Sequence, residues 1–343
     1  MRASTVSSLE FTVVDVIDET PDARTIVLRP TDEGELPAYK PGQFLTFKVT
    51  SDREGGCARS YSLCSAPGLD DHLAVTIKRT AGGYASNLLN DTLTVGDTVS
   101  TLRPAGTFTP LTLDEDLVLV AGGSGITPVL SILRSVLARG RGRVALLYAN
   151  RDEASVIFAA RLRELALAHP ERFTVIHWLE SVQGIPAPGP WRSLLKPYAG
   201  RRAFVCGPGP FMAMVTDTLR EVGMAPDRIT TEEFISLTGD PFSLPEVDPA
   251  AEVGSVEVTL DGVVTTIEWP SNARLLDVML AAGLEAPWSC REGRCSTCAC
   301  YLTEGSVELA HNEVLDAQDL REGLILACQA TATSTHAAIT FDT

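Results

Sequence analysis

Residues 290–300 read CREGRCSTCAC, and another cysteine ends the apolar run LILAC at residues 324–328. The pattern is C-x4-C-x2-C followed by a distant fourth cysteine, a spacing that places four thiolates around a 2Fe–2S cluster. The intervening residues are small or flexible, so backbone N–H groups can point at the sulfur atoms and stabilise their charge. The predicted iron ligands are Cys290, Cys295, Cys298 and Cys328.

Zinc is the competing interpretation of these cysteines. Structural zinc sites more often use two separated C-x2-C pairs, so the spacing favours the iron–sulfur cluster. A zinc-stapled structural module would instead contain stoichiometric zinc and show no cluster absorbance. Cys300 breaks the spacing, and we expect it to be a small buried residue.

The chain is acidic and has an ordinary globular composition. It has 343 residues, of which 45% are hydrophobic and 21% charged, and a formal net charge of −16. Residues 250–343 hold 14 Asp and Glu against 4 Arg. Nucleic acid is excluded as a partner because phosphate neutralisation requires a basic face. The acidic charge of residues 250–343 has two interpretations. It either attracts a basic patch on a partner protein or another domain, or it is a solvated surface that aids solubility.

No segment of the sequence predicts a membrane or secreted protein. No apolar run approaches the ~20 residues of a membrane-spanning helix, so no membrane insertion is expected. The N-terminus MRASTVSSLE has no apolar signal core. Clustered cysteines in a reducing compartment indicate metal or redox chemistry. We therefore expect a cytoplasmic protein.

Three zones with different patterns follow one another along the chain. Short strand-like segments separated by Gly, Pro and Asp predict an antiparallel β-barrel. Apolar strands alternating with helices then predict a doubly wound parallel α/β sheet. A Pro- and Gly-rich stretch precedes a small α+β module that begins with a hairpin. The predicted units are a barrel at 7–112, a nucleotide-binding domain at 113–237, a linker at 238–253 and a cysteine domain at 254–343.

Short motifs stand in the first two zones. They are RSYS at 59–62, KRTAGGYASN at 78–87, AGGSGITP at 121–128, CGPGPFM at 206–212 and EEF at 232–234. The third lies between a buried strand and a periodic helix, where a dinucleotide-binding loop belongs. Its glycines let the backbone approach phosphate, and Pro128 suits the first turn of a helix.

With these motifs in this order, the chain resembles the ferredoxin–NADP reductase superfamily, with a plant-type ferredoxin of β-grasp fold at its C-terminal end. The resemblance implies a bound FAD, a nicotinamide dinucleotide and a 2Fe–2S cluster. Segment 78–87 favours FAD over FMN, since relatives that use FMN lack it. The implied flavin-binding residues are Arg59, Ser60, Tyr61, Ser62, Lys78, Gly82, Gly83, Ser86 and Phe234. The implied nucleotide-binding residues are Gly122, Gly123, Gly125, Thr127, Arg151, Cys206, Gly207 and Pro208.

The resemblance also implies individual roles. The Arg59 guanidinium would pair with the flavin pyrophosphate, the Tyr61 ring would stack on the isoalloxazine, and the Ser62 hydroxyl would reach its N5/O4 edge. Cys206 would lie against the nicotinamide and Glu232 near the reactive edge of the flavin. We therefore expect Ser62, Cys206 and Glu232 at the site of hydride transfer.

The choice of nicotinamide depends on residues 148–152, YANRD. Arg151 could bind a 2′-phosphate and favour NADPH, whereas Asp152 would repel that phosphate and favour NADH. An exposed Arg–Asp pair with neither role is equally compatible with the sequence. NADH is our prediction, and NADPH stays open.

The predicted electron path runs from NAD(P)H through FAD and the 2Fe–2S cluster to a terminal oxygenase protein. YANRDEASVIF at 148–158 and VIHWLESVQGIP at 175–186 are similar to reductase components of 3-ketosteroid 9α-hydroxylases. The alternatives are the reductase subunit of a phenylacetyl-CoA epoxidase and a flavin and iron–sulfur redox sensor. A sensor needs no electron acceptor, so turnover with an added acceptor separates it from a reductase.

Overall fold

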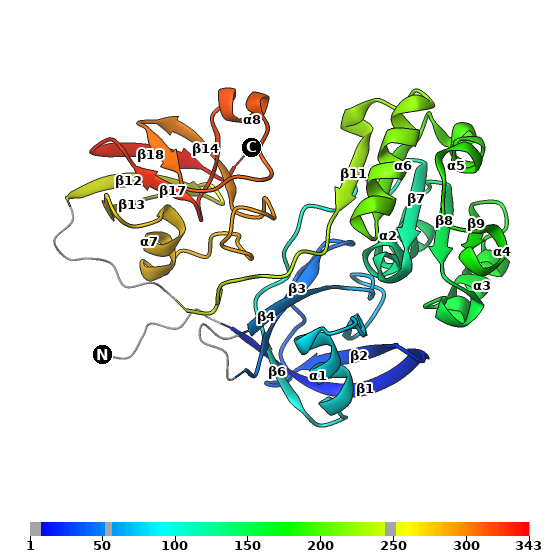
Figure 1. Cartoon of the computed structure of the whole chain (residues 1–343). Coiled ribbons are helices and arrows are strands. Elements are labelled where there is room, and N and C mark those ends of the chain that lie inside the picture. The colour runs from blue at the N-terminus through cyan, green and yellow to red at the C-terminus, as the bar shows by residue number, and fades with distance from the viewer. Residues whose placement is uncertain (1–7, 52–56, 244–251, 343) are drawn as a thin grey trace.

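The structure is a computed structural model that describes residues 8–51, 57–243 and 252–342. Three large sheets follow one another along the described residues, and the first lies between the other two (Figure 1). The predicted linker 238–253 and the predicted start of the barrel domain at residue 7 lie partly outside the described residues. Within those residues, no helix has the length and apolar character needed to cross a bilayer.

The first sheet is antiparallel and six-stranded, with the order β4-β3-β6-β1-β2-β5. A bridge between Leu63, the residue after β4, and Val75 of β5 brings the two edges of the sheet together and closes the barrel, so the predicted barrel is confirmed. Helix α1 (Tyr84–Thr92) follows the fifth strand. The strands are β1 (Leu9–Thr20), β2 (Ala23–Pro30), β3 (Phe44–Val49), β4 (Cys57–Ser62), β5 (Leu73–Lys78) and β6 (Thr98–Thr101).

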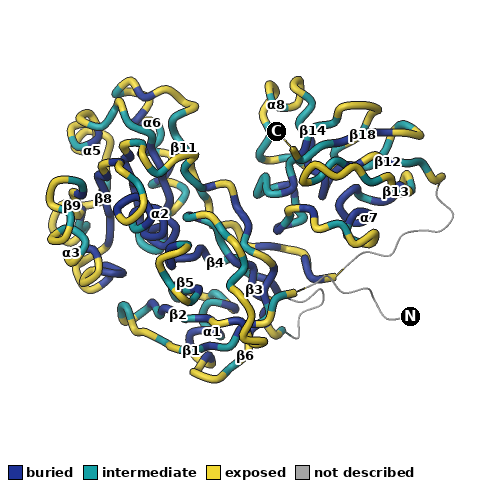
Figure 2. The backbone as a smooth tube through the Cα atoms, turned by 180° about the vertical axis from the view of Figure 1, so that it is seen from behind, coloured by how far each residue is buried: buried dark blue, intermediate teal, exposed yellow. Residues whose placement is uncertain are grey.

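The second sheet is parallel, in the order β11-β10-β7-β8-β9, with helices on both faces. Every residue of β7 and β8 is buried, as the continuous apolar runs predict, and Figure 2 shows this buried core. Helices α2 and α3 cover one face, and α5 and α6 cover the other. The strands are β7 (Leu117–Gly122), β8 (Val144–Asn150), β9 (Phe173–Leu179), β10 (Arg202–Cys206) and β11 (Ile229–Glu232). The helices are α2 (Ile126–Arg139), α3 (Ala159–Ala168), α4 (Glu180–Gln183), α5 (Pro188–Leu195) and α6 (Gly209–Glu221).

The third unit is a mixed five-stranded sheet, in the order β13-β12-β18-β14-β16, with a small β15-β17 ribbon. Helix α7 packs its buried side chains into the core of this unit. The indole N–H of the buried Trp269 donates to the Ala273 carbonyl over 2.9 Å. The strands are β12 (Val253–Leu260), β13 (Val263–Pro270), β14 (Ala299–Glu304), β15 (Val307–Leu309), β16 (Leu324–Leu326), β17 (Ala330–Ala332) and β18 (His336–Thr340). The helices are α7 (Leu275–Ala281) and α8 (Ala317–Arg321).

Contacts from α2 fix the parallel sheet against the barrel. Arg134 makes two hydrogen bonds to the Asp70 carboxylate, over 2.6 and 2.7 Å, and the Ser131 hydroxyl donates to the Ser65 carbonyl over 2.6 Å. These partners lie between β4 and β5 of the barrel, close in sequence to Ser62. The carboxyl ends of β7 and β10, where a doubly wound sheet binds its ligand, are thereby held beside the barrel.

Candidate functional site

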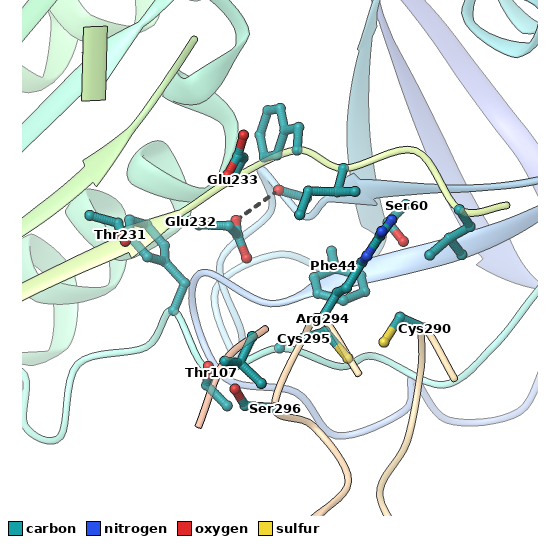
Figure 3. A pocket seen from close by; sticks show the side chains of 17 residues that line it. Phe44, Ser60, Thr107, Thr231, Glu232, Glu233, Cys290, Arg294, Cys295 and Ser296 are labelled. Carbon is teal, nitrogen blue, oxygen red and sulfur yellow. Dashed lines mark hydrogen bonds between the residues drawn. The ribbon is translucent and has the colours of Figure 1, made fainter. Parts of the chain in front are cut away.

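The three units meet at one cavity (Figure 3). The barrel contributes Phe44 and Ser62, the parallel sheet contributes residues 231–235, and the cysteine domain contributes Cys290 and Cys295. Motifs from all three zones of the sequence therefore line a single space. This cavity is where a redox group held by the barrel would face the cysteine loop.

A serine, a glutamate and a cysteine come together beside this cavity. The Ser62 hydroxyl donates to Glu232 Oε2 over 3.3 Å, and Cys206 and Glu232 are paired neighbours on β10 and β11. Burial raises the pKa of the Glu232 carboxyl to about 8. Burial also raises the pKa of the Cys206 thiol well above its usual value, and the Glu232 charge adds to this effect. At neutral pH the Glu232 carboxyl and the Cys206 thiol are therefore both protonated, and neither adds a negative charge to the site.

The RSYS segment presents its side chains in two directions. Ser60 and Ser62 line the cavity. Arg59 instead donates to the Leu237 carbonyl over 3.1 Å, and Tyr61 packs edge-on against a phenylalanine of the barrel core. Arg59 and Tyr61 are therefore not among the residues that line this cavity, whereas the two serines are.

The cavity combines apolar walls with hydrogen-bonding side chains. Phe44, Leu237 and Phe234 form apolar walls, and Phe234 is 47% exposed at the mouth. Ser62 and Glu232 offer hydrogen-bonding groups at the polar end. An isoalloxazine has this combination of an apolar face and a hydrogen-bonding edge.

The start of α1 fits a phosphate. Gly82 has a positive φ of 68°, and Gly83 is the residue before the helix, so no side chain caps α1. The Ser86 hydroxyl accepts a hydrogen bond from the Thr80 N–H over 3.1 Å and thereby folds the segment back on itself. Uncapped N–H groups at a helix N-terminus attract anions, which suits the pyrophosphate of FAD.

The loop after β7 packs tightly on the end of β10. A Cβ at Gly125 would lie 2.1 Å from the Cys206 carbonyl oxygen, and one at Gly207 would lie 3.0 Å from the Gly122 nitrogen. The Thr127 hydroxyl is used within the loop, since it donates to a loop carbonyl over 3.0 Å. Close packing of glycines at the switch point of the sheet is the arrangement that lets a backbone approach a pyrophosphate.

A second cavity, of about 410 Å³, opens at this loop. The sequence placed Asn150 in the segment 148–152 but gave it no role of its own. Its buried side-chain amide lies beside the Tyr148 hydroxyl but makes no hydrogen bond of normal geometry. Its place at the carboxyl end of β8 is the signal that could have found it. Predicted nucleotide-binding residues that line the cavity are Gly122, Gly123, Arg151 and Pro208, and Lys78, predicted as flavin-binding, also lines it.

The two cations of the second cavity share one acidic partner. Asp22, in the turn between β1 and β2, accepts from Arg151 over 2.9 Å and lies 3.8 Å from Lys78. Asp152 is used elsewhere, because its carboxylate accepts from the Ser155 N–H and caps a short 3₁₀ turn. The barrel thus supplies the carboxylate that faces Arg151, a contact the sequence could not reveal.

The four predicted iron ligands converge at one end of the third unit. The thiols contact one another in the order Cys295, Cys290, Cys328, Cys298. The hydrogen bonds of Cys295 and Cys328 lower the pKa of the Cys290 thiol, and the Glu292 N–H donates to its sulfur over 3.3 Å. In the described part of the chain, no three His, Cys, Asp or Glu side chains are arranged as around a single metal ion. The assignment of these thiols to a 2Fe–2S cluster and not to zinc rests on the C-x4-C-x2-C spacing with a distant fourth cysteine.

Three protein-family models match the chain in the order of its sheets. They are an oxidoreductase FAD-binding domain at residues 10–109, an oxidoreductase NAD-binding domain at 119–217 and a 2Fe–2S iron–sulfur cluster binding domain at 258–333. The barrel, the parallel sheet and the cysteine domain therefore define an electron-transfer reductase that uses FAD, a nicotinamide dinucleotide and a 2Fe–2S cluster.

Curated relatives extend this result over the whole chain. The ferredoxin reductase component of 3-ketosteroid-9-alpha-monooxygenase from Mycolicibacterium smegmatis is 52% identical, and the match covers 97% of each chain. The component with the same name from Mycobacterium tuberculosis H37Rv is 51% identical over 97% of this chain and 96% of its own. The chain belongs to the family of ferredoxin reductase components of 3-ketosteroid 9α-monooxygenases. One component of the 1,2-phenylacetyl-CoA epoxidase of Escherichia coli is 29% identical, and the match covers 97% of each chain.

Solved structures share the fold. Phthalate dioxygenase reductase has a TM-score of 0.56 at 24% identity, with 98% of both chains covered. An intact type IV self-sufficient cytochrome P450 monooxygenase has a TM-score of 0.64 at 24% identity, covering 97% of this chain and 41% of its own. The multidomain fold predicted from the sequence is confirmed.

Proposed function

We propose that this reductase takes electrons from NADH and delivers them one at a time to the oxygenase component of a 3-ketosteroid 9α-hydroxylase. The observation that carries the proposal is 51–52% identity to those reductase components along 97% of the chain. The phenylacetyl-CoA epoxidase alternative has a relative with only 29% identity. When bound, the flavin supplies hydride uptake and the release of single electrons to the cluster.

The chain's own residues position these groups. Ser62 and the protonated Glu232 offer hydrogen bonds at the flavin edge, and Cys206 lies beside Glu232 on the neighbouring strand β10. The glycines of the loop after β7 receive the dinucleotide pyrophosphate. The four cluster ligands are Cys290, Cys295, Cys298 and Cys328. Arg59 would have to leave the Leu237 carbonyl to reach a flavin phosphate.

We also propose the units 7–112, 113–237 and 254–343, joined by the linker 238–253, and a cytoplasmic location. The location is supported by eight cysteines without a disulfide, which suit a reducing compartment. NADH is favoured over NADPH because Asp22 engages both Arg151 and Lys78. A 2′-phosphate would have to compete with that carboxylate for the same two cations.

Reconstitution with an oxygenase tests the proposal. The purified chain is mixed with the oxygenase component of the M. smegmatis 3-ketosteroid 9α-hydroxylase, a 3-ketosteroid and NADH, and 9α-hydroxylated product is measured. We expect product formation coupled to NADH oxidation. The matched control uses the oxygenase component of a glycine betaine monooxygenase with its own substrate. Equal or faster turnover in the control would contradict the proposed partner.

Asp22→Asn should shift the preference between the two nicotinamides. Removing this carboxylate frees Arg151 and Lys78 for a 2′-phosphate, so the ratio of kcat/KM for NADPH to that for NADH should rise about tenfold. Asp18→Asn is the control, because Asp18 forms a surface ion pair with Arg24 and, among the residues that the structure describes, with no other cation. A ratio that stays unchanged in Asp22→Asn would show that the two cations do not contact the adenosine end.

Glu232→Gln should remove a pH dependence from flavin reduction. Because the pKa of Glu232 is raised to about 8, the carboxyl is neutral below that pH and charged above it. A negative charge in the cavity opposes the arrival of a hydride, so the rate in the unmodified protein should fall about tenfold from pH ~7 to pH ~9.5. Stopped-flow reduction by NADH should show a flat profile for Glu232→Gln, and the exposed Glu171→Gln should keep the decline. An identical decline in Glu232→Gln would assign it to another group.

A further inference from the structure

Glu292 connects the cysteine loop by hydrogen bonds to residues 238–239, which follow the residues that line the flavin cavity. Its Oε1 accepts three hydrogen bonds, from the Thr238 N–H over 2.6 Å, the Thr238 hydroxyl over 2.7 Å and the Gly239 N–H over 2.7 Å. Glu292 stands two residues after Cys290, and its side chain is 15% exposed. Three hydrogen bonds to one carboxylate oxygen, largely shielded from water, are a strong and directional contact.

The neighbouring Arg291 holds the far end of the same segment. Its guanidinium donates to the Pro241 carbonyl over 3.3 Å and also to the Ser243 carbonyl. It pairs as well with the buried Asp277 of α7. Two consecutive side chains of the cysteine loop thus bind residues 238–243 at both ends.

The segment is equally attached to the barrel. Leu237 and Phe242 pack with Ala58 and Leu102 of the barrel and with Cys290 in one apolar cluster. The Arg59 guanidinium also donates to the carbonyl of Leu237. Residues 237–243, which we call the docking segment, are therefore held between the flavin domain and the cysteine loop.

The docking segment continues directly from the wall of the flavin cavity. Residues 231–235 line that cavity, Leu237 lines it too, and Cys290 and Cys295 face it from the opposite side. Any movement of the loop away from the docking segment would widen the gap between the flavin site and the cysteines. Electron transfer between two such sites slows steeply as the gap grows.

We propose that Glu292 is a positioning residue for electron transfer from the flavin to the cluster, acting by locking the cysteine loop onto the docking segment. The inference rests on the proposed function. In the step concerned, one electron leaves the reduced flavin and is taken up by the one-electron cluster, and no protein bond forms or breaks. Hydride transfer, which we propose at Ser62, Cys206 and Glu232, does not depend on this contact.

Anaerobic stopped-flow mixing with NADH separates the two steps by the absorbance of flavin and cluster. In Glu292→Ala we expect flavin reduction within about twofold of the unmodified rate and cluster reduction about tenfold slower, since charge-assisted hydrogen bonds are lost. Glu292→Gln keeps an oxygen acceptor and should recover most of the rate. Glu308→Ala, which removes an exposed carboxylate from the same domain, should behave as the unmodified protein.

The Thr238→Val variant tests the same contact from the other side. It removes the hydroxyl donor and leaves the cysteine loop untouched, so it should slow cluster reduction by about threefold without changing iron content or the EPR spectrum. If Glu292→Ala fails to hold iron, this variant decides the question. Cluster reduction at the unmodified rate in Thr238→Val, or in an iron-replete Glu292→Ala, would overturn the inference. If NADH does not reduce the flavin of the unmodified protein, the proposed function fails instead.

Discussion

Cys295→Ser should abolish the delivery of single electrons while NADH still reduces the flavin. Cys295 contacts Cys290, and both thiols line the shared cavity on the side of the cysteine domain. Losing one of four thiolates removes the ligand set that the cluster requires. We expect cytochrome c reduction to fall at least about 100-fold and the cluster absorbance to vanish. Ferricyanide, which accepts electrons from the flavin directly, should be reduced at the unmodified rate.

Cys300→Ala is the matched control for that experiment. Cys300 is buried in the core of the same domain, its pKa is raised by burial, and it is not among the thiols that contact one another. This variant should keep its iron and its cytochrome c activity. Loss of flavin reduction in Cys295→Ser would mean that the cysteine domain is needed upstream of the flavin, against the order of transfer proposed.

Gly125→Ala should slow reduction by NADH about 100-fold while leaving both redox groups in place. The new Cβ would lie 2.1 Å from the oxygen and 2.4 Å from the carbon of the Cys206 carbonyl, so the backbone of the loop or of β10 has to move. Overpacking of this kind costs about 1–3 kcal/mol, and it displaces the loop expected to hold the pyrophosphate. We expect kcat/KM for NADH to fall about 100-fold, since misplacing bound groups by about 1 Å has effects of that order.

Dithionite separates loss of nucleotide binding from loss of the cofactors. It should still bleach the flavin and the cluster of Gly125→Ala fully. Gly189→Ala is the control, because a Cβ at that position of α5 has no atom within 4 Å, and its kinetics should be unchanged. A Gly125→Ala protein with unmodified kcat/KM would show that the dinucleotide does not approach this loop.

Local patterns in the sequence predicted the sheets correctly and indicated which cysteines would hold the cluster. The apolar run at β7, buried on every residue, and the spacing of the cysteines depend on neighbours a few positions away. The geometry of a buried strand requires a run of apolar residues, and the cluster requires a fixed spacing of its cysteine ligands. Both requirements leave a regular pattern in the sequence. The glycine loop after β7 was predictable for the same reason.

Contacts between distant segments were not predictable. Asp22 and Arg151 are 129 positions apart, and neither residue has a local feature that indicates the other. The stretch from residue 238, predicted as a linker from its Pro, Gly and acidic residues, starts with a segment held by Glu292 and Arg291. Polar side chains choose partners by where the folded backbone places them, which composition does not encode.

An anaerobic titration with NADH, followed by visible absorbance, tests the central account most directly. Each NADH brings two electrons, and a flavin with one 2Fe–2S cluster accepts three. Flavin and cluster bands should both bleach, and bleaching should be complete at about 1.5 equivalents of NADH. Bleaching that stops at about one equivalent with the cluster still oxidised, or no bleaching at all, would contradict an electron path from NADH through the flavin to the four cysteines.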